Sequence, residues 1–186
     1  MNPLELQIRT VIWMLAIGNF TALLTLVAYA SGKAHGRTYK QFVASKLLQT
    51  IAWGLLEFRD QIPDILSADL GNTLLISGFA LESLALTTTS KPNRKRELTY
   101  GITATLGILA FVFFAKTPNL RVSIASMVNM VLFGMASVTM LRTPAKSSLR
   151  KAIGVFLGVF STMLGIRASM AFYLPHQFGL LYTHPV

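Results

Sequence analysis

The stretch VSIASMVNMVLFGMASVTML, residues 122–141, contains twenty consecutive residues without a charged side chain. An α-helix needs about 20 apolar residues to cross the hydrocarbon core of a bilayer. Further stretches of similar length and composition lie along the chain, so the sequence predicts an all-α fold, a polytopic transmembrane helix bundle of about six spans. The predicted spans are Val11–Ala30, Gln41–Phe58, Ile65–Thr88, Leu98–Ala115, Val122–Leu141 and Ala152–Tyr173.

The composition supports this fold class and excludes others. Hydrophobic residues make up 53% of the 186 residues, and charged residues only 13%, whereas a soluble domain carries about 25% charged residues. The chain contains no cysteine, which excludes disulfides, iron–sulfur clusters and thiolate metal sites. Because no repeat or low-complexity linker divides the sequence, residues 1–186 are predicted to form a single transmembrane domain.

The net charge of +10 is concentrated in loops beside the apolar spans. Eleven of the seventeen Lys and Arg residues follow the first, third and fifth spans. The positive-inside rule therefore places these loops in the cytoplasm and the N-terminus outside, as in a multi-pass protein of a bacterial inner membrane. The same placement excludes a nucleic-acid partner. The eleven are Lys33, Arg37, Lys40, Lys91, Arg94, Lys95, Arg96, Arg142, Lys146, Arg150 and Lys151; the opposite side carries Arg9, Arg59, Lys116, Arg121, Asp60, Asp64 and Asp69.

Two charges, Lys46 and Glu82, lie inside predicted spans, where an unpaired charge is costly. Each is about two turns from the cytoplasmic end of its span, so antiparallel neighbouring helices would bring them together. We interpret them as a structural ion pair that fixes helix register. A proton or ion relay is the alternative, and it is less favoured because one pair near an interface does not form a pathway.

A second polar group is predicted near the outer surface, where the second span ends, the third begins and the sixth ends. Arg167 lies about two turns inside the sixth span, so its charge needs a partner at that depth. The arrangement fits either a structural knot or the polar floor of a ligand pocket open to the periplasm. The candidate ligand-binding residues are Trp53, Glu57, Arg59, Asp69, Asn72 and Arg167.

The remaining polar and small residues fit helix packing. Asn19 and Asn129 lie in mid-span, a position typical of interhelical hydrogen bonds. Gly154 and Gly158 form a GxxxG step, with Gly165 two turns further on, which favours close helix packing and leaves homodimerisation open. No catalytic or phosphate-binding motif occurs. The sequence therefore predicts a protein that is not an enzyme, with no cofactor and no metal.

The segment around Arg59, Pro63 and Asn72 resembles the membrane-integral N-terminal sensor regions of bacterial diguanylate cyclases (GGDEF) and histidine kinases. In those regions an apolar helix ends in Arg, a Pro follows, and an Asn opens the next helix. They also carry an Arg late in the sixth helix, here Arg167. The resemblance implies a seventh span and a cytoplasmic output domain, which the 186 residues do not include.

The leading interpretation is a membrane-integral sensory input module that binds a ligand and is surrounded by membrane lipid. Its expected partner is a small molecule from the periplasmic side. Two other classes stay open: a small transporter or channel subunit, and a structural subunit of a membrane complex. Polar residues near the midplane and broken helices would favour transport.

Overall fold

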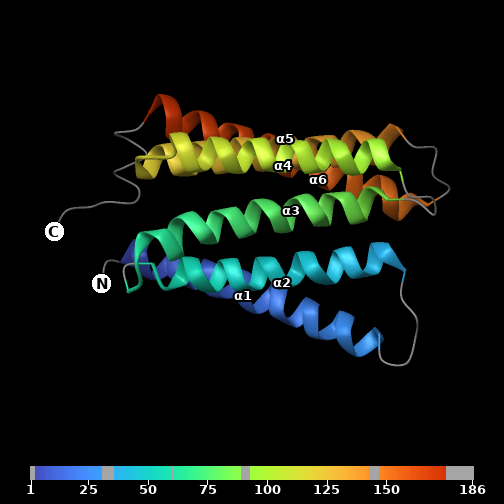
Figure 1. The fold of residues 1–186 in the computed structure, drawn as a ribbon, viewed down its shortest axis with the longest axis horizontal. Helices are drawn as coiled ribbons and strands as arrows, with labels where there is room; N and C mark the ends of the chain where they lie inside the picture. The colour runs from blue at the N-terminus through green and yellow to red at the C-terminus, as the bar shows by residue number, and fades with distance from the viewer. Residues whose placement is uncertain (1–2, 31–35, 60, 89–92, 143–146, 175–186) are drawn as a thin grey trace. The chain divides into compact units, whose positions relative to one another are not determined.

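The computed structural model describes residues 3–30, 36–59, 61–88, 93–142 and 147–174, without the side chains of residues 3–9 and 30. These ranges are almost entirely helical and contain no strand, so the all-α prediction is confirmed. An isolated bridge joins Arg59 to Ile62 in a turn. The helices are α1 (Pro3–Ala30), α2 (Arg37–Glu57), the π-helix η1 (Ile65–Leu70), α3 (Gly71–Thr87), α4 (Arg94–Phe114), α5 (Pro118–Arg142) and α6 (Ser148–Tyr173) (Figure 1).

The observed helices match the predicted spans closely at their C-terminal ends. At their N-terminal ends α2, α4, α5 and α6 begin four residues earlier than predicted. In α4 the added turn is Arg94-Lys95-Arg96-Glu97, which is charged but still helical, since Asn93 Oδ1 accepts from the backbone N–H groups of Lys95 and Arg96. Apolar length marks the bilayer crossing, whereas the helix continues to its cap.

Five helical stretches are long and apolar enough to cross a membrane. The sequence predicted about six. Helix α2 forms where the second span was expected, but it is not among the five, because its polar residues, among them Lys40, Gln41, Lys46 and Gln49, make it less apolar than the others. The five stretches are Thr10–Tyr29, Ile65–Thr87, Arg94–Phe114, Pro118–Arg142 and Ser148–Tyr173.

The described residues divide into two compact units, of which the first ends at Ala85 and the second begins at Leu86. Each unit is described by itself, and the single transmembrane domain stays a prediction. The first unit holds α1, α2, η1 and most of α3; the second holds the end of α3 with α4, α5 and α6. Four residues of the charge pattern, Lys33, Asp60, Lys91 and Lys146, lie outside the described residues.

In the first unit, α2 packs against both of its neighbours. The hydroxyl of Tyr39 donates to the carbonyl of Leu26 and so ties α2 to α1. At the other contact, a Cβ added to Gly78 of α3 would lie 2.9 Å from Gln49 Cγ and 3.2 Å from the carbonyl oxygen of Ser45. Gly78 therefore lets the backbones of α2 and α3 approach closely, as small residues do in membrane bundles.

In the second unit, three serine hydroxyls join α5 to α6 at intervals of seven residues. Ser123 Oγ donates to the carbonyl of Ala168 at 3.0 Å, Ser161 Oγ to that of Met130 at 2.8 Å, and Ser137 Oγ to that of Gly154 at 2.7 Å. Seven residues are about two helical turns. The bonds therefore follow one seam along the two antiparallel helices.

The glycines singled out in the sequence lie on this seam. A Cβ on Gly154 would meet Leu141 at 3.1 Å, one on Gly158 would meet Ser137 Oγ at 2.9 Å, and one on Gly165 would meet Met130 Sδ at 2.8 Å. The prediction of close helix packing is confirmed, and α5 of the same chain occupies this face. Homodimerisation stays a prediction.

The two mid-span asparagines show no interhelical hydrogen bond within the described ranges. Asn19 Nδ2 donates to the carbonyl of Leu15 in its own helix. Asn129 is buried, and its Oδ1 has no hydrogen-bond partner there. The interhelical role expected for Asn19 is therefore wrong, because the side chain bonds back to its own turn.

We predict that Gly107→Val lowers the free energy of unfolding by about 1–3 kcal/mol, the usual effect of overpacking. A Cβ at Gly107 would clash with Val128 Cγ1 on α5. Gly101→Val is the matched control on the same helix, since a Cβ at Gly101 has no neighbour within 4 Å. Denaturant titration of the purified protein in micelles measures both. Equal losses for the two variants would show that the α4–α5 contact is not tight at Gly107.

Candidate functional site

The first polar cluster joins α2 to α3 in the first unit. Lys46 Nζ lies 2.7 Å from Glu82 Oε1, the contact that their positions in the sequence predicted. Gln49 Nε2 donates to the other carboxylate oxygen of Glu82 at 2.6 Å, and Gln49 Oε1 accepts from Lys46 Nζ at 3.4 Å. Both oxygens of Glu82 therefore have a donor, and three side chains form a closed triad.

The triad is largely removed from solvent. The side chains of Lys46 and Glu82 are 13% and 16% exposed, and Gln49 is only 1% exposed. Sequence reasoning missed Gln49, although its position one turn after Lys46 places both on one face of α2. Gly78 makes room for Gln49 from the opposite helix. Because the charges neutralise each other within the triad, its geometry is that of a structural clasp.

The second polar cluster begins at the end of α2. Glu57 is 7% exposed, and its Oε2 is buried without a hydrogen-bond partner among the residues that the structure describes. Trp53, one turn earlier on α2, is half-buried. Arg59 is exposed and forms no ion pair with Glu57 within those ranges. A buried carboxylate oxygen without a donor is uncommon in folded proteins.

The chain then enters the π-helix η1, which sequence reasoning did not predict. The carbonyl of Pro63 accepts from both the Leu66 and Ser67 backbone N–H groups, at 2.8 and 3.1 Å. Ser67 is fully buried. Proline cannot donate a backbone hydrogen bond, so the turn that follows Pro63 has an irregular start. Short π-helical segments occur frequently at functional sites.

The remaining candidate residues lie where η1 joins α3. Asn72 Nδ2 donates to the carbonyl of Ala68 at 2.7 Å, so this amide group is bonded within its own helix. Asp69 is half-buried, and its carbonyl accepts from Thr73 Oγ1 at 2.8 Å. A Cβ on Gly71 would lie 3.2 Å from Leu56 Cγ, which brings this junction against the end of α2. The end of α2 and the junction of η1 with α3 therefore lie together in the first unit.

Arg167 belongs to α6 in the second unit. Its side chain is exposed, and within the described part of that unit it takes part in no hydrogen bond or ion pair. The proposed partners of Arg167 belong to the first unit. A contact between Arg167 and these residues stays a prediction.

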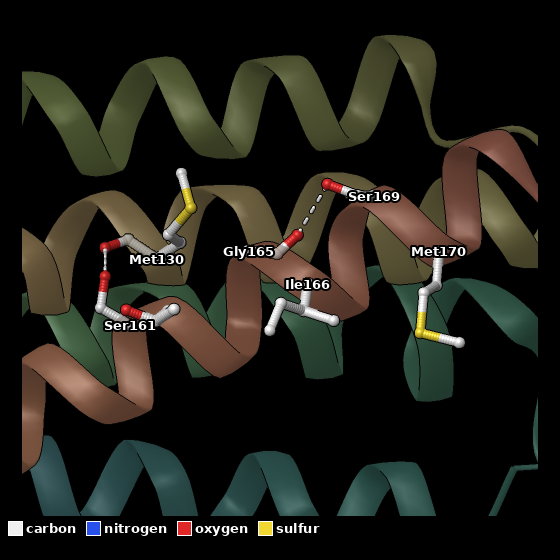
Figure 2. A pocket seen from close by; sticks show the side chains of 7 residues that line it. Met130, Ser161, Gly165, Ile166, Ser169 and Met170 are labelled. Atoms are coloured by element: carbon white, nitrogen blue, oxygen red, sulfur yellow. Dashed lines mark hydrogen bonds between the residues drawn. The ribbon is translucent and has the colours of Figure 1, made fainter.

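A groove of about 540 Å³ lies along α5 and α6, and the sequence did not predict it. Figure 2 shows Ser161 bonded to Met130 and Ser169 bonded to Gly165. Thr162 Oγ1 likewise donates to the carbonyl of Gly158. These hydroxyls are already bonded, so the groove offers mainly apolar surface. It is lined by Met130, Ser161, Thr162, Gly165, Ile166, Ser169 and Met170.

Metal ligands do not gather in the described ranges, where no group of three or more His, Asp or Glu side chains could hold an ion. Among the described residues of the first unit, the triad is closed, whereas Glu57 keeps one carboxylate oxygen without a donor.

We predict that Glu82→Ala destabilises the protein by about 3 kcal/mol, because it leaves the charge of Lys46 buried without a partner. The double change Lys46→Met with Glu82→Gln should recover much of that loss, since it removes both charges and keeps the volume. A double-mutant cycle on unfolding in micelles measures the coupling. If the effects of Lys46→Met and Glu82→Gln simply add in the double variant, the ion pair is absent in the folded protein.

The comparisons with known proteins assign no family to this chain. No family model matches it, and neither does any curated protein or any solved structure. The function is therefore argued from the chain's own residues.

Proposed function

We propose that this protein is a membrane-integral sensory module that binds a small molecule at the outer end of its first unit. The observation that carries the proposal is Glu57, whose carboxylate is buried with one oxygen lacking a donor. Leaving a buried acceptor unsatisfied costs about 1–3 kcal/mol. A ligand that brings an N–H, an O–H or a positive charge to Glu57 would recover that free energy on binding.

The position of Glu57 suits a sensor because irregular backbone follows directly. The π-helix η1 begins eight residues after Glu57 and continues into α3. Small changes of its hydrogen bonding can rotate or shift the helix that it begins. A ligand that binds one of these arrangements more tightly shifts the population toward it. In the proposal, Trp53, Arg59, Asp69 and Asn72 complete the polar and aromatic lining.

The proposal includes six spans, with α2 as the sixth crossing helix. Two features of the first unit support this. Helix α2 has 21 residues, which at ~1.5 Å per residue reach about 30 Å, and its interior charge is neutralised by Glu82. A charge paired inside the bundle is tolerated in the bilayer far better than one facing lipid. The basic loops then lie in the cytoplasm of a bacterial cell, where a shift would reach an output domain.

A transporter is the second candidate, and the triad is the observation that favours it. Lys46, Gln49 and Glu82 place ionisable and amide groups inside the helical part of the first unit. The closed bonding of the triad argues against transport, because both carboxylate oxygens already have donors. Solute or proton flux into liposomes that contain the purified protein would favour the transporter.

We predict that Glu57→Gln raises the free energy of unfolding of the empty protein by about 1–3 kcal/mol, because the amide needs no counterion in a buried position. The neighbouring Asp64→Asn, at an exposed position, should change it by less than about 0.5 kcal/mol. Thermal or denaturant unfolding in micelles measures both. Destabilisation by Glu57→Gln would mean that the carboxylate has a counterion in the folded protein and belongs to a structural knot.

The same pair of variants tests binding. Compounds that carry amine or hydroxyl donors should raise the melting temperature of the wild-type protein and of Asp64→Asn. The shift should disappear in Glu57→Gln. A compound that stabilises all three proteins equally binds elsewhere, and a library that yields only such compounds contradicts the proposed site.

The orientation gives a further prediction. A reporter inserted at residues 91–96 should read cytoplasmic, and one at residues 59–64 should read periplasmic, because the basic loop residues are retained on the inner side. Paired alkaline phosphatase and fluorescent protein fusions measure this, with the two reporters serving as each other's control. The reverse pattern would place Glu57 at the cytoplasmic end and remove the periplasmic ligand.

A further inference from the structure

A second groove, of about 390 Å³, lies between α4 and α5 in the second unit. Its polar end is formed by Arg96 and Thr139, near the start of α4 and the end of α5. Gly134 lies five residues before Thr139, which is about 7.5 Å further along the helix. Between Gly134 and the polar end the groove is lined by Met135 and Val138, and Val138 is 47% exposed, so the groove opens outward. The remaining lining residues are Thr99 and Tyr100.

The groove therefore changes character along its length. At the helix ends it offers the Arg96 guanidinium, while the Thr99 and Thr139 hydroxyls already donate to the carbonyls of Lys95 and Met135. Along the helices it offers apolar side chains and the gap left by Gly134. Arg96 uses one N–H to donate to the carbonyl of Thr87 at the end of α3. A guanidinium has five donors, so others stay available. A ligand with an anionic head and an apolar tail matches this gradient.

The polar end of the groove is also the most basic part of the unit. Helix α4 starts there, α5 ends there and α6 starts there, because neighbouring helices are antiparallel. In the described segments 93–97, 139–142 and 147–151, Glu97 is the single acid. The positive field of these residues attracts anions to the groove. The basic residues are Arg94, Lys95, Arg96, Arg142, Arg150 and Lys151.

Arg150 is a second, independent feature that suits an anion. Its Nε and Nη2 atoms are buried and have no hydrogen-bond partner among the residues described. Arg150 lies one turn before Gly154, which contacts Leu141 near the end of α5. The N-cap residue of α6, Ser147, makes no side-chain cap, so first-turn N–H groups of that helix also need acceptors. Phosphate oxygens match a guanidinium fork and a helix N-terminus.

We propose that this end of the second unit binds an anionic phospholipid, with the headgroup phosphate on Arg96 and Arg150 and one acyl chain in the α4–α5 groove. Basic pockets between membrane helices suit such headgroups. The basic residues favour an anionic lipid over a zwitterionic one. The apolar part of the groove favours a lipid over free phosphate.

Native mass spectrometry of the full chain in detergent tests the proposal, with phosphatidylglycerol and phosphatidylcholine added separately. We expect phosphatidylglycerol to bind about tenfold or more tightly than phosphatidylcholine. Arg150→Gln should weaken phosphatidylglycerol binding by about tenfold or more, the effect of losing a charge-assisted hydrogen bond. Arg150→Lys, which keeps the charge and loses the fork, should weaken it less.

Lys116→Gln is the matched control, because it makes the same charge change at the opposite end of α4 and α5, where Lys116 is exposed. It should leave phosphatidylglycerol binding within about twofold. Val138→Phe fills the groove and should weaken lipid binding without touching a charge. Equal binding of the two lipids, or equal effects of Arg150→Gln and Lys116→Gln, would overturn the proposal.

Inorganic phosphate is the second probe. In the proposed site, millimolar phosphate should compete weakly with phosphatidylglycerol, because it lacks the acyl chain. Complete displacement by phosphate, together with unchanged lipid binding in Val138→Phe, would assign the site to a soluble anion and overturn the lipid assignment.

Discussion

The triad of Lys46, Gln49 and Glu82 is the constraint on which the first unit depends. Helix α2 is the least apolar of the helices proposed as spans, and its charge is tolerable inside a bundle only while Glu82 neutralises it. That contact in turn needs Gly78, because any larger residue would displace Gln49. One glycine and three polar side chains thus determine the alignment of α2 with α3, and with it the place where the end of α2 meets the junction of η1 and α3.

The two units solve the same packing problem with different chemistry. In the second unit, serine hydroxyls donate to backbone carbonyls, so α5 and α6 are joined without any charge. In the first unit, ionised side chains join α2 to α3. Neutral bonds of the first kind tolerate contact with lipid, whereas an ion pair needs shielding. The unit with ionised groups is also the unit with the open carboxylate oxygen of Glu57.

Sequence reasoning located the helices because charge and apolar length are encoded locally. It also placed Lys46 opposite Glu82, since two unpaired charges at one depth have few other partners. It missed Gln49, because a neutral amide gives no signal of burial. It missed η1 for a different reason: a π-helix forms where backbone N–H groups bond the carbonyl five residues back, and hydropathy carries no record of that bonding. For the α5–α6 contact the sequence predicted the close-packing glycines but not the serine hydrogen bonds, because serine-to-carbonyl bonds depend on exact helix register.

The even spacing of the serine bonds has a mechanical consequence. All three bonds recur at seven-residue intervals, so a sliding motion of α5 along α6 would break them together, and the next comparable alignment lies about 10 Å away. The three bonds therefore resist sliding of α5 against α6, and the two helices tilt or rotate together. A displacement of α5 along its axis is therefore coupled to a displacement of α6.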